Sequence, residues 1–185
     1  MLAYVFWHWP QPGVDRAAYE ANLLTFHKTL TTHKPPGFLS STVFSIEAAN
    51  WLEATGPVFE DWYLMENSAA MDRLNDGAVT GVCEQPHNVV AKEAAGGTAG
   101  LYRLRQGTGN LSNKRVAVWF SKPAGVSYKD FFAQLSEENL PGTSLWQRQM
   151  TLGPTTEFCM LSENEEAASR VAGQRVSLAP IWSGS

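Results

Sequence analysis

The chain contains only two cysteines in 185 residues, Cys83 and Cys159, and they lie far apart with no CxxC spacing. Neither a disulfide framework nor a zinc site is therefore expected, and a reducing, cytoplasmic location is the default. Lysine and arginine form no cluster and the net charge is -4, which argues against nucleic acid or an anionic membrane surface as partner. No apolar run is long enough to span a bilayer, and the first ten residues lack the basic start of a signal peptide.

Several sequence motifs that are typical of particular catalytic or binding sites are also absent. There is no GxGxxG after a strand and no GxxxxGK[ST], which excludes the common nucleotide fingerprints. HExxH, an EF-hand loop and a GxSxG elbow are missing too, so the motifs predict no metal site and no serine nucleophile.

What the sequence does contain is an internal repeat. At an offset of about one hundred residues, two stretches of the first half match two stretches of the second half. The matched pairs are Trp7 with Trp119, Gly13 with Gly125, Leu23 with Leu135, Glu60 with Glu157 and Leu64 with Leu161. Each copy is longer than a solenoid repeat, which runs to about 50 residues, so the pattern predicts two related half-structures fused in line.

Periodicity and turn residues give both halves the same order of elements, β-α-β-β-α-β. The expected strands are 2–9, 39–46, 57–65 and 100–105, then 115–121, 144–152, 156–162 and 175–182. The expected helices are 15–33, from 67 or 68 to 74, 87–95, 127–138 and 164–172. We predict an α+β fold of two ferredoxin-like repeats, at 1–105 and 115–185, joined by the polar, Gly-rich linker 106–114. Such a unit covers one sheet face with helices, so its other, apolar face must pack against a second sheet.

Two segments of the first half carry a family resemblance. Residues 9–19, with their Pro-Gln-Pro-Gly turn, and the stretch Phe26-His27-Lys28-Thr29-Leu30 resemble the opening of the EthD-like branch of the dimeric α/β-barrel superfamily. The acidic-aromatic stretch Phe59-Glu60-Asp61-Trp62-Tyr63 is similar to a strand of the same branch. The resemblance covers residues 1–105, and the second half matches in outline.

The resemblance implies a barrel that is usually built from two chains and is here formed within one. Related proteins include cofactor-free enzymes that isomerise lactones, cyclise polyketides or oxygenate quinols, and haem proteins such as the chlorite dismutase group. The helix histidine of the isomerase-like members matches His27, and the first-strand histidine of some cyclases matches His8. We therefore expect no cofactor, with haem as the alternative.

The two halves differ in their polar side chains. His8 aligns with Phe120, His27 with Asn139 and Asp61 with Phe158, and all four histidines lie in the first half. Any chemistry is therefore expected in the first half, with the second half completing the barrel.

Helical geometry places His27 on the flank of an apolar stripe formed by Tyr19, Leu23, Phe26 and Leu30. A histidine there can exchange a proton near neutral pH, or it can simply cap carbonyls in the last helical turn. His8 points to the same side of its strand as Tyr4 and Phe6, where it is either a hydrogen-bonded core residue or part of a pocket. Asp61 shares a strand face with Tyr63.

The sequence hypothesis is a cofactor-independent enzyme that uses His27 as acid or base, with His8, Asp61 and Tyr63 orienting it. Its substrate would be a small aromatic or polyketide-like molecule, a lactone or a phenol, and the reaction an isomerisation, cyclisation, aromatisation or oxygenation. The alternatives are a haem protein and a non-catalytic ligand-binding barrel, as monomer or homodimer. The expected aromatic wall of the pocket is Phe6, Trp7, Trp9, Phe26 and Trp62.

Overall fold

The computed structural model describes residues 1–47, 49–54, 56–137 and 140–185. Within these ranges the first half contains strands β1 (Leu2–Pro10), β2 (Phe38–Ile46), β3 (Val58–Met65) and β4 (Ala94–Gln106). Its helices are α1 (Arg16–His33), α2 (Ala69–Val79) and α3 (Glu84–Glu93), with the 3-10 turn η1 (Gly81–Cys83) between the last two. The second half contains strands β5 (Val116–Phe120), β6 (Thr143–Arg148), β7 (Phe158–Ser162) and β8 (Gln174–Gly184), and helices α4 (Tyr128–Glu137) and α5 (Glu165–Ser169).

The strands close into one antiparallel barrel in the order β1-β3-β2-β8-β5-β7-β6-β4. Each half has the strand order of a ferredoxin-like unit, β4-β1-β3-β2 and β8-β5-β7-β6. The halves join through two strand pairs, β2 with β8 and β4 with β6. The two junctions are equivalent, because β2 and β4 of the first half correspond to β6 and β8 of the second. This arrangement confirms the predicted fold, two ferredoxin-like repeats that form a barrel within one chain.

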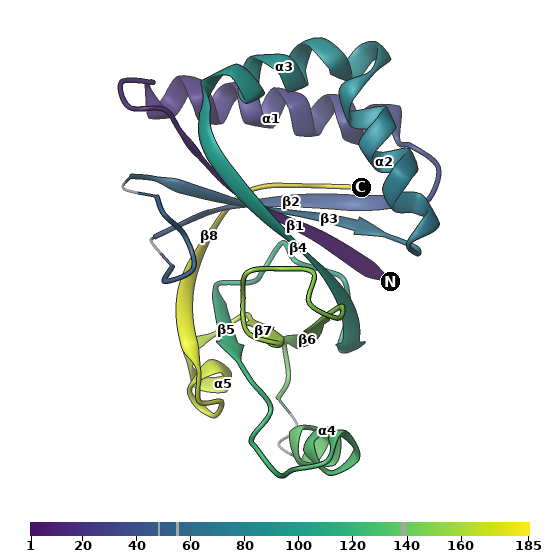
Figure 1. Cartoon of the computed structure of the whole chain (residues 1–185), viewed down its shortest axis with the longest axis vertical. Coiled ribbons are helices and arrows are strands. Elements are labelled where there is room, and N and C mark those ends of the chain that lie inside the picture. Colours follow the sequence, from purple (N-terminus) through teal and green to yellow (C-terminus); the bar gives the residue numbers. More distant parts are fainter. Residues whose placement is uncertain (48, 55, 138–139) are drawn as a thin grey trace.

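Helices lie outside the barrel on opposite sides (Figure 1). Helices α1, α2 and α3 lie together over the sheet of the first half, whereas α4 and α5 lie against the second half. The first half therefore has a second layer of structure over its outer sheet face, and the space between these layers contains the candidate site.

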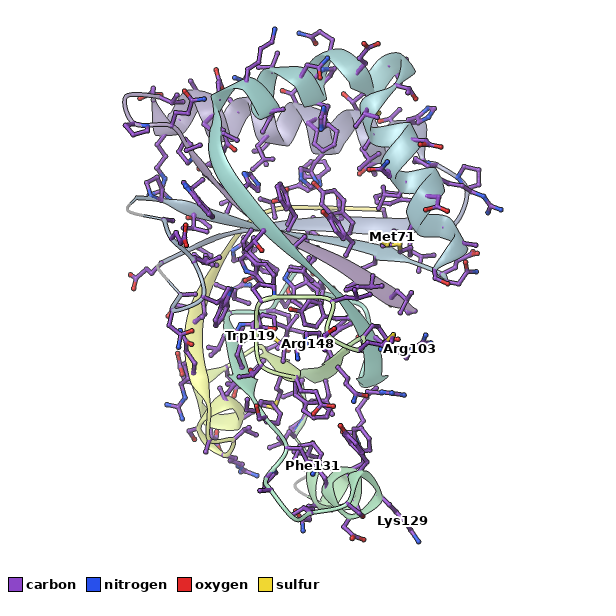
Figure 2. All side chains as sticks on the ribbon, in the orientation of Figure 1. Met71, Arg103, Trp119, Lys129, Phe131 and Arg148 are labelled. Atoms are coloured by element: carbon purple, nitrogen blue, oxygen red, sulfur yellow. The ribbon has the colours of Figure 1, made fainter. Side chains whose placement is uncertain are left out.

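The barrel interior is filled with large aromatic side chains. Trp7, Trp62, Trp119 and Trp146 are all fully buried there. Trp7 and Trp119 hold equivalent positions in the two repeats, and their ring centroids lie 5.6 Å apart at an edge-on angle of 63°. The duplicated tryptophans thus meet inside the barrel, where Figure 2 labels Trp119.

Helix α1 follows the local rules read from its sequence. The side chain of Asp15 accepts a hydrogen bond from the Ala18 amide at 2.8 Å and caps the helix start. The helix ends at His33, and the next residue, Lys34, adopts a left-handed conformation with φ of 50°, just before Pro35. His27 is completely buried together with Leu23 and Leu30, so it belongs to the buried stripe and not only to its flank.

Several element boundaries were predicted wrongly. Helix α2 runs to Val79 and not to residue 74, α3 spans Glu84–Glu93 and not 87–95, and α5 ends at Ser169 and not at residue 172. Strand β4 begins at Ala94 and not near residue 100, because Gly96 and Gly97 are strand positions crossed by aromatic rings. A Cβ atom at Gly97 would lie 2.5 Å from the ring of Phe6, so a glycine is needed for this close approach rather than for a turn. Strand β6 ends at Arg148 and not at residue 152, because Met150 turns the chain with a φ of 52°.

Candidate active-site cavity

A cavity of about 600 Å³ lies between the first-half sheet and helices α1, α2 and α3. Strand side chains form its floor, with His8 and Phe6 from β1 and Asp61 and Tyr63 from β3. Its walls are mainly apolar and come from the helices. The other lining residues are Tyr4, Tyr19, Leu23, Phe26, Met71, Asp72, Leu74, Asn75, Ala78, Val79, His87, Val90, Ala91, Ala94, Ala95 and Gly96.

The strand register brings the polar residues together. Strand β1 pairs with β3 so that Phe6 lies opposite Asp61, which places His8 one step along the same face. On the other side of β3, Ser41 of β2 lies opposite Tyr63. Helix α1 supplies Tyr19 and His27 from above this face.

One oxygen of Asp61 is the centre of the cluster. Its Oδ2 lies 3.2 Å from Nε2 of His8 and 3.1 Å from Nε2 of His27, and it accepts a hydrogen bond of 2.9 Å from the hydroxyl of Tyr63. Asp61 is 1% exposed, so these contacts are shielded from water. Its other oxygen, Oδ1, is buried and has no hydrogen-bond partner within the described part of the chain.

The charges of the cluster follow from its surroundings. Burial alone would raise the pKa of Asp61, but the neighbouring imidazoles of His8 and His27 and their hydrogen bonds hold that pKa well below its usual value. Burial, together with the charge of Asp61, raises the pKa values of Tyr63 and Tyr19. At neutral pH Asp61 is therefore a carboxylate and both tyrosines remain hydroxyl donors.

His8 lies in the wall of the cavity and is 2% exposed. Since Asp61 is ionised, it fixes the imidazole proton of His8 on Nε2, directed at Oδ2. The other nitrogen, Nδ1, then carries a lone pair and accepts a 2.7 Å hydrogen bond from the Tyr19 hydroxyl. His8 therefore presents a basic nitrogen that is oriented by a carboxylate and contacted by a second wall residue.

His27 lies behind the cavity wall rather than in it. Its ring stacks on that of Tyr63 at 5.1 Å and 16°, its Nε2 faces Asp61, and its Nδ1 lies 2.9 Å from Oγ of Ser41. Because His27 is fully buried and is not among the residues that line the cavity, it is placed to orient Asp61 and Tyr63. This differs from the sequence hypothesis, in which His27 was the acid or base and His8 assisted it.

The predicted aromatic wall is divided between the two faces of the sheet. Phe6 and Phe26 line the cavity. Trp7 and Trp62 point into the barrel instead, and Trp9 packs against that inner core, so none of the three lies among the lining residues of the cavity. The alternation of β1 and β3 explains this, because neighbouring residues of a strand point to opposite faces.

The inner tryptophans hold a buried acid that sequence reasoning missed. Trp62 donates its indole N–H to Oε1 of Glu60 and Trp7 donates to Oε2, each at 2.6 Å. Burial raises the pKa of Glu60 to about 7, although the two indole hydrogen bonds oppose this shift. Glu60 and Asp61 are thus adjacent acids on opposite faces of β3, with opposite pKa shifts.

Sequence reasoning also missed Tyr19, Ser41 and His87. Tyr19 was interpreted as part of an apolar stripe, and its hydroxyl gave no separate signal. Ser41 could have been found from the strand register opposite Tyr63. His87 lines the cavity from α3 and is half-buried, whereas sequence reasoning assigned it no role.

The equivalent space of the second half is filled with hydrocarbon. Phe120 and Phe158 replace His8 and Asp61, and both pack against Phe131 of α4, with ring centroids 6.2 and 5.0 Å away. Figure 2 labels Phe131, whose side chain extends from α4. Asn139, which aligns with His27, lies outside the described residues. The described part of the second site therefore lacks the polar cluster of the first.

The cavity wall does not fit a haem. A haem needs an imidazole nitrogen for its iron, but both nitrogens of His27 and Nε2 of His8 are in hydrogen bonds within the cluster, and the iron would have to displace the Tyr19 hydroxyl from Nδ1 of His8. Haem propionates are anions, and the lining contains Asp61 and Asp72 but, among the residues described, no lysine or arginine. His87 is the other histidine of the lining. A haem bound through it would still face this wall, whose described residues include no lysine or arginine to pair with the propionates. Over the described ranges, no group of three or more histidine, cysteine or acidic side chains has a geometry that could hold a metal ion.

Comparisons with known proteins support the fold. No family model matches the chain, and no curated protein matches it either. Among solved structures, a proposed monooxygenase of Fusobacterium nucleatum is similar, with a TM-score of 0.66, 10% identity and coverage of 99% of this chain and 93% of that one. An anthrone oxidase-like protein gives a TM-score of 0.58 at 12% identity, covering 98% of this chain and 92% of that one.

A third similar structure is a proposed chlorite dismutase, with a TM-score of 0.54 and 14% identity. The alignment covers 97% of this chain and 95% of that one. At these sequence identities the similarity supports a shared fold but not a shared activity. None of the helices in the described ranges combines the length and the hydropathy needed to cross a membrane.

Proposed function

Since the chain has the dimeric α/β-barrel fold with both ferredoxin-like units in one polypeptide, we propose that its first half is an enzyme site for a small planar organic molecule. The reaction is a proton transfer next to a carbonyl or at a ring hydroxyl, without a cofactor. The observation that supports this most is the arrangement of His8 in the cavity wall, where its Nε2 lies 3.2 Å from Oδ2 of Asp61 and its Nδ1 lies 2.7 Å from the Tyr19 hydroxyl.

The wall is suited to an aromatic ring. Five aromatic side chains besides the histidines His8 and His87 line it, namely Tyr4, Phe6, Tyr19, Phe26 and Tyr63, and aliphatic helix residues complete it. Such walls exclude water and stack with a flat ligand. A cavity of about 600 Å³ is within the usual range for small-molecule sites.

In the proposed mechanism, the substrate displaces the Tyr19 hydroxyl from Nδ1 of His8, and the freed Nδ1 takes a proton from an acidic C–H or O–H of the substrate. The imidazolium that forms is stabilised by the carboxylate of Asp61, which Tyr63 and His27 hold in place. Once Nδ1 is protonated it cannot accept the Tyr19 hydrogen bond again. The Tyr19 hydroxyl is then free to donate to the substrate oxygen, where the negative charge of the enolate or phenolate develops.

Returning the proton to another carbon completes an isomerisation or aromatisation. Attack of the same anion on an electrophile within the substrate would give a cyclisation. Its reaction with molecular oxygen would be a monooxygenation. The names of two structural neighbours, a proposed monooxygenase and an anthrone oxidase-like protein, favour oxygenation as the second candidate. Both candidates share the first proton transfer.

Hydrogen–deuterium exchange tests this first step separately from the later ones. Anthrone, a planar ketone with acidic C–H bonds, is incubated with the protein in D₂O, and its exchange is followed by NMR while an electrode records oxygen uptake. We expect His8→Gln to slow protein-catalysed exchange by about 100-fold, the usual contribution of a positioned base. His33→Gln, at an exposed histidine of the same half, is the matched control.

Exchange and oxygen uptake that are both equal in wild type and His8→Gln would refute the proposal. Exchange without oxygen uptake supports isomerase-type chemistry, whereas uptake that depends on His8 supports oxygenation.

A further inference from the structure

We propose that the cavity selects against anionic ligands and that Asp72, at its rim, binds a hydrogen-bond donor on the substrate. The substrate class is then a planar aromatic alcohol without carboxylate or phosphate groups, carrying a second hydroxyl or an ammonium group. This inference rests on the proposed function for the inner hydroxyl, but its test measures binding and not turnover.

The first argument is the charge of the lining. It contains two acids, Asp61 and Asp72, and, among its described members, no lysine or arginine. Asp61 is already an anion at the floor, with one oxygen lacking a partner in the described part of the chain. A second negative charge brought into this wall would be desolvated and would meet no cation, which is costly.

The second argument is a polar edge on an otherwise apolar cavity. Asp72 and Asn75 are three residues apart on α2 and therefore lie on one helix face, and both are exposed members of the lining. His87 contributes a half-buried polar ring from α3. Within the ranges that the structure describes, the carboxylate of Asp72 forms no ion pair and no hydrogen bond. An acceptor with no protein donor is therefore available to a ligand.

The floor and the rim together define a ligand with two polar groups. One hydroxyl meets His8 and Tyr19 at the buried floor, the ring lies between the aromatic walls, and a donor meets Asp72 at the exposed rim. The same geometry does not favour a ligand whose second group is a carboxylate, because Asp72 would repel it.

Three ligands that share one naphthol ring system provide the test. They are 2,6-dihydroxynaphthalene, 6-aminomethyl-2-naphthol and 6-hydroxy-2-naphthoic acid, which place a hydroxyl, an ammonium or a carboxylate at the same ring position. Binding is measured by calorimetry at low ionic strength, since salt screens an exposed charge. We expect the diol and the ammonium compound to bind at least tenfold more tightly than the carboxylate compound.

In the Asp72→Lys variant, the ratio of the diol's affinity to the carboxylate compound's affinity should fall by about tenfold, because the substitution replaces repulsion of the carboxylate with attraction at the rim. Glu53→Lys makes the same charge change at an exposed acid that is outside both the lining and α2, and it should leave the preference unchanged. Equal affinities for all three ligands, tightest binding of the carboxylate, no binding of the diol, or equal effects of the two lysine variants would each overturn the inference.

Failure of the proposed function gives a different result. In that case the charge preference and its dependence on Asp72 persist, but His8→Gln leaves hydrogen–deuterium exchange unaltered.

Discussion

At the scale of single residues, the cluster is organised by one carboxylate oxygen with three donors around it. The four residues that the sequence singled out, His8, His27, Asp61 and Tyr63, do converge on one another. Their order from cavity to core could not be predicted, because it depends on the exact rotation of α1 over the sheet. A rotation of one residue, about 100°, would exchange wall and interior positions.

Replacement of His27 by alanine should act mainly through Asp61. The change leaves a buried carboxylate with one donor fewer and a void beside Tyr63, so we expect the free energy of unfolding to fall by about 2–4 kcal/mol. Chemical denaturation measures this loss, and His33→Ala on the same helix is the control. If His27 positions the cluster, the remaining activity should also show a shifted pH profile, whereas an unchanged profile together with wild-type stability would contradict this role.

At the scale of the elements, the strands and helices follow from alternation, caps and turn residues, and their existence was predicted well. The main failure was the start of β4, because residues 94 and 95 were expected to end a helix and the strand was expected only from residue 100. Glycines in a sequence indicate either a turn or a close approach, and only the position of the opposing Phe6 and Trp9 rings decides between them.

Gly97→Ala should therefore destabilise the protein although alanine is usually tolerated in strands. The new methyl group would meet the Phe6 ring at 2.5 Å and force it toward the cavity. We expect a loss of about 1–3 kcal/mol in thermal or urea unfolding, the usual cost of overpacking. Gly56→Ala, where an added Cβ has no neighbour within 4 Å, should change stability by less than about 0.5 kcal/mol. A Gly97→Ala variant as stable as Gly56→Ala would show that β4 does not lie against Phe6.

At the scale of the whole molecule, two similar halves carry different interiors. The duplication was visible in the sequence because Trp7 and Trp119 align, and the structure brings these two rings into contact. The loss of polarity in the second half was also visible, since Phe120 and Phe158 replace ionisable residues. The buried Glu60 was not predicted, because an acid within an apolar strand gives no sign of which neighbours will solvate it.

Glu60 and Asp61 together predict how stability depends on pH. The folded-state pKa of Glu60 is about 7, above its ordinary value of 4.5, so the folded protein binds this proton more tightly than the unfolded chain. Its contribution is complete below pH 4.5 and is lost as the pH rises through 7, by at most about 3 kcal/mol. Asp61 has a lowered pKa, so its contribution is present above about pH 4 and is lost on further acidification.

The summed contribution of Glu60 and Asp61 to the free energy of unfolding is therefore largest between about pH 4 and 5.5. Urea unfolding between pH 3 and 9 measures the profile, and Glu60→Gln should remove the decline between pH 5 and 8 while lowering stability throughout. A decline of the same slope in Glu60→Gln would assign it to other groups.

The most direct test of the proposed acid–base site is the position of the proton on the His8 ring. Long-range ¹H–¹⁵N spectra of the ¹⁵N-labelled protein, with His8→Gln to assign the signals, distinguish a protonated ring nitrogen from a bare one. At neutral pH we expect Nε2 of His8 to carry the proton toward Asp61 and Nδ1 to appear as a bare, hydrogen-bonded acceptor. A proton on Nδ1 with a bare Nε2 would leave no base facing the cavity and would contradict the mechanism.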